Sequence, residues 1–215
     1  MKMPEPAMPL TSPEEQERFL NVPNILTLLR FGLVPVFLFL VLEKKALGAL
    51  LVFSFAGLTD VLDGMAARIW RLKTKIGMLL DPLADKSLLA TAFVLLTVPS
   101  LNSPYSLPLW LTVTVLARDA ILIAGGVAIF GMRGRKEFPP SLYGKISTIL
   151  QVGTVFWVLF SNYARISPLK EIALLSPLTS PAVLSALYYL TLVFTALSGA
   201  HYIQSGVRMA FDKDK

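Results

Sequence analysis

Residues 47–69 form an apolar run, LGALLVFSFAGLTDVLDGMAARI, that is long enough to cross about 30 Å of hydrocarbon as a helix. Two aspartates, Asp60 and Asp63, lie near its end, where an isolated charge costs about 2.5–3.5 kcal/mol on membrane-insertion scales. The run therefore predicts a membrane-spanning helix whose acidic residues serve a purpose.

Five further apolar runs of similar length occur along the chain, so the fold class that we predict is all-α and integral to a membrane. The predicted spanning helices cover residues 25–42, 47–69, 77–98, 108–130, 142–163 and 182–206. The composition agrees, since 54% of the 215 residues are hydrophobic and only 16% are charged. This balance excludes an ordinary soluble domain.

The two ends of the chain differ from this pattern. Residues 1–11 are rich in proline and predict disorder, whereas Thr11 to Glu15 has the cap, proline and early acids of a helix start. We expect a short amphipathic surface helix over residues 13–20 and no signal peptide. A six-helix domain over residues 21–210 and a polar tail over 211–215 would follow.

The net charge of +6 resides largely in short loops between the apolar runs, which indicates membrane topology instead of nucleic-acid binding. By the positive-inside rule, both termini and the loops near residues 71–75 and 133–136 face the cytoplasm. We therefore expect an integral protein of a bacterial inner membrane, with its functional face in the cytoplasm and no nucleic-acid partner.

Four aspartates gather around the loop between the second and third predicted helices. Asp60 and Asp63 are three residues apart and Asp81 and Asp85 are four apart, so each pair lies on one helix face. A short loop makes the two helices antiparallel neighbours, and the two faces can converge into a four-carboxylate cup. Such carboxylates repel one another unless cations neutralise them.

Two divalent cations are the cofactors that this cup predicts. The chain has no cysteine and a single histidine, so oxygen ligation of Mg²⁺, Mn²⁺ or Ca²⁺ is favoured. Two such ions can clamp a pyrophosphate, while one carboxylate at the edge takes a proton from an incoming hydroxyl. Gly64 and Gly77 would let a nucleotide approach the backbone, and Arg68 offers a planar fork for its phosphates.

The same aspartates have a plainer interpretation, in which they cap helix ends or pair with nearby basic residues. Those residues are Arg68, Lys73, Lys75 and Lys86. Four acids at two adjacent helix ends favour the functional interpretation.

The segment from Asp60 to Asp85 resembles the signature of the CDP-alcohol phosphotransferase family, with the family's spacing throughout. The matching residues are Asp60, Asp63, Gly64, Ala67, Arg68, Gly77, Asp81 and Asp85. The resemblance implies a six-helix fold, usually a homodimer, that moves the phosphatidyl group of CDP-diacylglycerol to an alcohol and releases CMP.

The resemblance also implies a role for each residue. Asp60, Asp63 and Asp81 would carry most of the ligation of two Mg²⁺ or Mn²⁺ ions. Asp85 would be both a metal neighbour and the catalytic general base. The residues expected to contact the cytidine diphosphate are Asp60, Gly64, Ala67, Arg68, Thr74 and Gly77.

Segments outside the signature are similar to two branches of the family, the phosphatidylglycerophosphate synthases and the cardiolipin synthases. These segments are residues 21–30, 80–86, 117–119 and 144–151. Residues 55–60 are similar to cardiolipin synthases of the mitochondrial type, and Asp119 replaces the glutamate usual in the other branch. Gly144 and Lys145 are closer to the phosphatidylglycerophosphate branch, so the acceptor alcohol stays open.

Glycerol 3-phosphate is the first choice of acceptor because basic residues on the predicted inner face would attract a small dianion, and phosphatidylglycerol is the second. The candidate acceptor residues are Arg118, Lys145, Arg133 and Arg135. For Arg118 a buried structural ion pair is an equal alternative. Arg30 can take the same roles as Arg118 or snorkel to the headgroups, and we favour snorkelling. We expect His201 to pack between helices through a hydrogen bond.

A membrane transporter is the alternative from another class, since intramembrane charges also occur in ion-coupled carriers. The acids gather at one end of the predicted helices and not at the membrane midplane, and no pseudo-symmetric halves are visible. An inactive scaffold related to the enzymes is a third possibility, which the intact acid set disfavours.

Overall fold

The computed structural model describes residues 22–70, 77–101, 104–133, 142–167 and 175–211. Side chains are described for residues 28–59, 86–101, 104–125, 142–167 and 177–205, and elsewhere in the described range the backbone alone is given. The predicted surface helix over residues 13–20 and the polar tail after residue 211 lie outside the described range.

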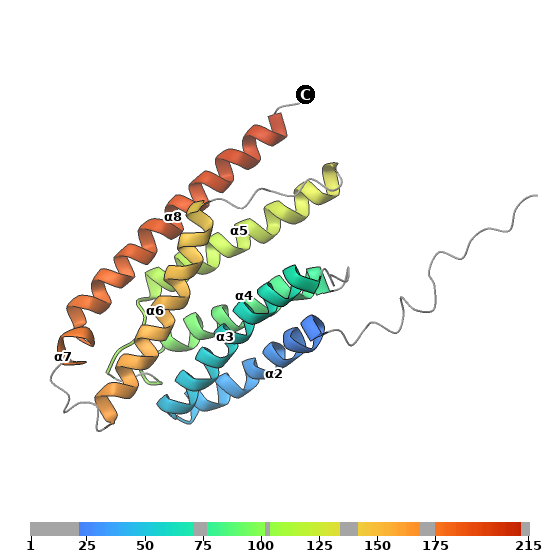
Figure 1. The fold of residues 1–215 in the computed structure, drawn as a ribbon. Coiled ribbons are helices and arrows are strands. Elements are labelled where there is room, and N and C mark those ends of the chain that lie inside the picture. The colour runs from blue at the N-terminus through green and yellow to red at the C-terminus, as the bar shows by residue number, and fades with distance from the viewer. Residues whose placement is uncertain (1–21, 71–76, 102–103, 134–141, 168–174, 212–215) are drawn as a thin grey trace, which may run out of the picture.

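The described residues are helical and contain no strand, which confirms the predicted all-α class (Figure 1). Six helices are long, and α7 is a single turn. Their bounds are α2 Val22–Leu42, α3 Ala46–Trp70, α4 Gly77–Thr97, α5 Leu109–Arg133, α6 Leu142–Ile166, α7 Leu175–Leu178 and α8 Pro181–Phe211. Each predicted apolar run coincides with one long helix, and α8 extends five residues beyond its predicted end at residue 206.

Local chemistry explains where several helices begin and end. Pro181 occupies the first position of α8, where a missing N–H is tolerated, and the Ser180 hydroxyl accepts a hydrogen bond from the Val183 N–H. At the end of α2, the Lys45 N–H donates to the Leu40 carbonyl and the Lys44 N–H donates to the Val41 carbonyl. This pattern is the Schellman motif, and Lys44 has the left-handed conformation that it requires, with a φ of 56°.

The long helices expose apolar side chains on their outer surfaces. Val113 on α5 is 57% exposed and Ile149 on α6 is 70% exposed. Within the described residues, the helical stretches Leu142–Ile166 and Pro181–Ser205 are long and apolar enough to cross a membrane. Shorter apolar stretches lie in α2, α3 and α4. An apolar outer surface of this extent is that of a membrane protein.

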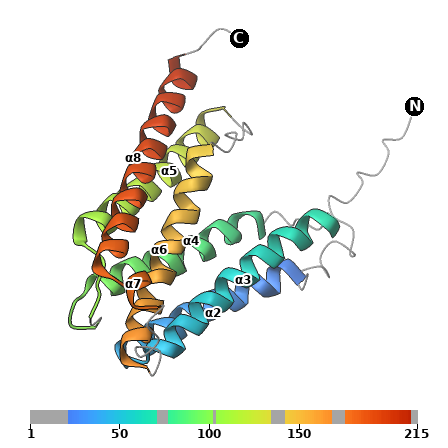
Figure 2. The same cartoon turned by 60° about the vertical axis from the view of Figure 1, so that its left-hand side comes forward.

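The helices form two groups that diverge toward one end of the bundle (Figures 1 and 2). In one group α2 packs against α3 and α4, and in the other α8 packs against α5 and α6. Contacts between α3 and α6 hold the groups together, around core residues such as Phe37, Phe93, Leu96 and Val155. The divergent end holds the last turns of α3, α5 and α8 and the first turns of α2, α4 and α6 (Figure 1).

Candidate active site

The four aspartates of the sequence lie on α3 and α4 at the divergent end of the bundle. Asp60 and Asp63 belong to the last turns of α3, and Asp81 and Asp85 to the first turns of α4. Only residues 71–76 join the two helices, and both helices pack against α2. The structure describes the backbone of these four residues but not their side chains, so the predicted carboxylate cup stays a prediction.

Arg30 on α2 lies level with Asp60. The rings of Phe37 on α2 and Phe53 on α3 are 6.1 Å apart between centroids, and the two helices run in opposite directions. Arg30 lies two helical turns from Phe37, and Asp60 lies two helical turns from Phe53, in both cases toward the divergent end. Arg30 is only 2% exposed, so the prediction that it snorkels is wrong. A buried cation lies at the height of the acidic residues.

Lys86 directly follows Asp85 and anchors α4 to α5. Its Nζ lies 2.8 Å from Oδ2 of Asp119, whose Oδ1 accepts a hydrogen bond of 2.7 Å from Nη1 of Arg118. The Oγ of Ser198 on α8 accepts two further hydrogen bonds from Arg118, 2.7 Å from Nη2 and 3.3 Å from Nε. We call Lys86, Asp119, Arg118 and Ser198 the charge network. It ties three helices together next to Asp85.

The charge network bears on two earlier interpretations. Lys86 was a possible partner for the four aspartates, and among the residues whose side chains are described it pairs with Asp119. Arg118 was a candidate for an acceptor pocket or for a structural ion pair. Its side chain is 7% exposed and hydrogen-bonded to two residues, which is the geometry of a structural ion pair.

The other candidate acceptor residues are not joined to Arg118 by a described contact. Lys145 is exposed near the start of α6 and forms no ion pair with the described residues. Arg133 is the last residue of α5, and its side chain is not described. Arg135 and the candidate nucleotide residue Thr74 lie outside the described range. Gly64, Ala67 and Arg68 lie on α3 and Gly77 begins α4, described by backbone alone.

A row of buried hydroxyl and amide groups joins α6 to α8, and the sequence interpretation missed it. Ser147 and Thr195 are 3.0 Å apart between their hydroxyl oxygens, and Nε2 of Gln151 donates to both. The hydroxyls of Thr154 and Thr191 are 2.7 Å apart. We call these five residues the polar seam. The α6 half of the polar seam could have been found in the sequence, because spacings of four and three place Ser147, Gln151 and Thr154 on one helix face.

Two further contacts join α8 to its neighbours. A Cβ added to Gly125 would lie 2.9 Å from Cε1 of Tyr202, so this glycine permits a close approach of α5 and α8. His201 is exposed, and its ring lies 5.7 Å from the ring of Tyr143 between centroids. It thus bridges α8 and α6 by a ring contact, whereas we expected a hydrogen bond.

A family model, described as CDP-alcohol phosphatidyltransferase, matches residues 20–198. The chain belongs to this family. The match includes α3, α4 and all four aspartates, so the resemblance found in the sequence is confirmed.

Several named proteins are similar to this chain. A protein of Aquifex aeolicus named CDP-diacylglycerol--glycerol-3-phosphate 3-phosphatidyltransferase is 33% identical over 89% of this chain and 99% of its own length. The CMP-forming cardiolipin synthase of Streptomyces coelicolor is 38% identical over 62% of this chain. The human cardiolipin synthase is 41% identical over 64% of this chain. The chain spans 62% of the Streptomyces protein and 43% of the human one.

Enzymes of the CDP-alcohol phosphatidyltransferase family generally depend on divalent metals. The donor set of this chain fits such ions, because carboxylates are hard oxygen ligands and two pairs of them occupy helix ends joined by a short segment. Among the residues that the structure describes, no group of three or more acidic, histidine or cysteine side chains forms another metal site.

Proposed function

We propose that this protein is a membrane phosphatidyltransferase that moves the phosphatidyl group of CDP-diacylglycerol to a glycerol-type alcohol and releases CMP. The observation that carries the proposal is the placement of Asp60, Asp63, Asp81 and Asp85 on two adjacent helix ends, within a family match over residues 20–198. We include in it six spanning helices, a homodimer, and a site on the cytoplasmic face of a bacterial inner membrane.

The proposed roles follow the chemistry of each residue. Asp60, Asp63, Asp81 and Asp85 would hold two Mg²⁺ or Mn²⁺ ions, which supply positive charge against the pyrophosphate. The nucleotide would lie along Gly64, Ala67, Gly77 and Thr74, with Arg68 as a planar donor to phosphate. Buried Arg30, level with Asp60, would add positive charge at the same height.

The proposed reaction is a displacement at the β-phosphorus of CDP-diacylglycerol. The acceptor oxygen forms a new bond to phosphorus while the bond from phosphorus to the CMP oxygen breaks. The hydroxyl proton passes to the carboxylate of Asp85, which acts as the general base. The products are CMP and a phosphodiester lipid.

For the acceptor we propose glycerol 3-phosphate, as in the name of the Aquifex relative, which this chain matches over 99% of that protein's length. Arg133, Arg135 and Lys145 would attract this dianion from the divergent end of the bundle. Arg118 is the least favoured of the proposed acceptor residues, because its guanidinium already bonds to Asp119 and Ser198. Phosphatidylglycerol is the second candidate, because the identities to cardiolipin synthases of Streptomyces and human are higher, at 38% and 41%.

One assay tests both the class and the acceptor. Purified protein in detergent receives CDP-diacylglycerol with Mg²⁺ or Mn²⁺ and, separately, glycerol 3-phosphate, phosphatidylglycerol, serine or inositol phosphate. CMP release and the mass of the lipid product are measured, with an Asp81→Asn variant and a chelator as controls. We expect CMP only with a glycerol-type acceptor. The absence of CMP with every acceptor, in protein that inserts and melts normally, would refute the proposed function.

A further inference from the structure

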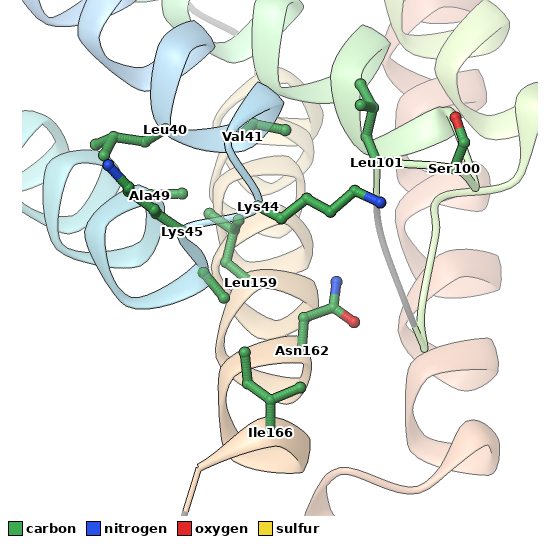
Figure 3. Close-up of a pocket in the computed structure, with 11 residues that line it drawn as sticks. Leu40, Val41, Lys44, Lys45, Ala49, Ser100, Leu101, Leu159, Asn162 and Ile166 are labelled. Carbon is green, nitrogen blue, oxygen red and sulfur yellow. The ribbon is translucent and has the colours of Figure 1, made fainter.

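A pocket of about 200 Å³ opens at the end of the bundle opposite the four aspartates. Figure 3 shows the side chains that line it. The pocket lies where α2, α4 and α6 end and α3 begins. Its walls are mainly apolar, and the polar groups around it come from Lys44, Lys45, Ser100 and Asn162. A cavity of roughly 150 Å³ admits a benzene-sized molecule, so this pocket has room for a group of several heavy atoms.

Lys44 supplies the cation that faces the pocket. Its side chain extends across the opening toward Leu101 and Asn162, whereas the side chain of Lys45 turns away (Figure 3). The Nζ of Lys45 lies 5.5 Å from the centre of the Phe39 ring. Lys44 forms no ion pair with the described residues, and the neighbouring Glu43 is exposed. The two adjacent lysines thus have different surroundings.

The backbone of Lys44 is unusual for its residue type. It occupies the left-handed position of the Schellman motif at the end of α2, with a φ of 56°. Glycine is the residue that favours this position, and a side chain there is strained. A strained non-glycine residue whose side chain extends over a pocket points to a function for that side chain.

Asn162 adds a buried polar group to the wall. It is 6% exposed, its Nδ2 donates 2.8 Å to the Tyr105 carbonyl, and its Oδ1 accepts 2.9 Å from the Tyr105 N–H. An amide nitrogen carries two donors, so one N–H of Asn162 is left for a ligand. Ser100 is exposed on the far side of the pocket, and its hydroxyl oxygen points away from Asn162 (Figure 3). Lys44 and Asn162 are therefore the donors available to an anion.

We propose that this pocket binds the head of one anionic phospholipid, with its phosphate on Lys44 and its glycerol region against the apolar wall. The inference rests on the membrane arrangement of the proposed function and concerns a site separate from the aspartates. A lipid is favoured over a free anion because the walls are formed by Leu40, Val41 and Leu159, which give a soluble ion nothing to bind. Ile166, 63% exposed at the rim, continues this apolar surface outward.

The test is native mass spectrometry of the full chain in detergent, titrated with dioleoyl phosphatidic acid or dioleoyl phosphatidylcholine. Phosphatidic acid is an anionic phospholipid outside the substrates of the proposed reaction. We expect one bound phosphatidic acid to be lost, or bound roughly tenfold more weakly, in Lys44→Gln. Lys45→Gln is the matched control and should bind as the wild type does.

Lys44→Gly separates binding from folding. Glycine suits the left-handed backbone, so this variant should melt at or above the temperature of the wild type while binding phosphatidic acid as weakly as Lys44→Gln does. CMP release should be unchanged in all three variants. If the wild type releases no CMP, the proposed function is refuted, but the measurement of lipid binding still tests this site.

Three results would overturn the lipid site. Equal losses in Lys44→Gln and Lys45→Gln would indicate diffuse surface charge. Equal binding of phosphatidylcholine and phosphatidic acid, unaffected by either substitution, would indicate an apolar groove without anion recognition. Displacement of phosphatidic acid by millimolar inorganic phosphate would indicate a site for a free anion.

Discussion

Asp85 lies one helical turn beyond Asp81 on α4, on the same helix face and further from the segment that joins α3 to α4. If it is the general base, Asp85→Asn keeps the shape of the side chain but cannot accept the proton. We expect the rate of CMP release to fall by about 10²–10⁴ while CDP-diacylglycerol still binds. Binding by calorimetry in Mg²⁺, measured beside CMP release, checks this.

Asp81→Asn is the control for that experiment, because a neutral amide is a poor ligand for a hard cation and substrate binding should fall with it. Should Asp85→Asn lose substrate binding as completely as Asp81→Asn does, Asp85 is chiefly a metal ligand. The base would then have to be another group.

Asp119 holds two cations of the charge network, and its removal tests the role of Arg118. In Asp119→Asn the buried Arg118 loses its only described counter-charge, which we expect to destabilise the fold by about 3 kcal/mol. Lys86→Gln should cost about 1 kcal/mol or less, because the Lys86 side chain is 29% exposed. Thermal unfolding in detergent measures both.

The same two variants decide between the structural and the acceptor interpretation of Arg118. A structural network predicts a lower melting temperature with an unchanged KM for the acceptor. A raised acceptor KM in Asp119→Asn, with normal melting, would instead place Arg118 in the acceptor pocket.

At the scale of the helices, the polar seam should account for part of the α6–α8 packing. Thr195→Val removes the hydroxyl that bonds to both Ser147 and Gln151 and leaves their buried polar groups short of a partner. We expect a loss of about 1 kcal/mol, in the upper part of the range for hydrogen bonds between membrane helices. Thr114→Val is the matched control, because the one described hydrogen bond of that hydroxyl goes to the Trp110 carbonyl of its own helix.

The melting temperature of Thr195→Val should therefore fall clearly more than that of Thr114→Val. Equal melting of the two variants would show that the seam contributes nothing to stability beyond bonds within one helix.

The positions of the helices could be predicted from the sequence, but the contacts between helices could not. Apolar runs bounded by loops fix helix positions, since a run such as residues 142–163 has few alternatives in a membrane. The pairing of Lys86 with Asp119 depends on how α4 packs against α5, 33 residues away, and no local pattern encodes that register. The burial of Arg30 was not foreseen for the same reason, because it follows from how α2 packs in the bundle, against α3 and α4.

The candidate site, too, could be predicted from the sequence only in part. Spacings of three and four residues predicted two aspartate pairs on helix faces, and the family match supports that choice. The neighbours of Arg118, Asp119 and Ser198, come from helix packing and not from sequence spacing alone, so the sequence left its acceptor and structural roles open. Carboxylate clusters are recognisable because charge is rare in apolar helices, whereas basic residues near helix ends have many roles.

At the scale of the whole molecule, the arrangement of six spans predicts which loops share a side of the membrane. The α2–α3 turn lies at one end of the bundle (Figure 1), and the segments 71–76 and 134–141 join helices at the other. The positive-inside rule predicts that Arg71, Lys73 and Lys75 face the cytoplasm with Arg135 and Lys136. Because the chain contains no cysteine, single cysteines can report this topology without removing native ones.

Glu43→Cys, Lys75→Cys and Lys136→Cys, each expressed in a bacterial host, form the test, with a maleimide that cannot cross the membrane as the probe. Glu43 is exposed in the α2–α3 turn, so Glu43→Cys should react in intact cells. The other two should react only after permeabilisation, since an even number of spans separates residue 75 from residue 136. Labelling of Lys75→Cys and Lys136→Cys from opposite sides would rule out the six-span arrangement. Labelling of both in intact cells, with Glu43→Cys protected, would keep the arrangement and reverse its orientation, which would move the aspartates to the outer face.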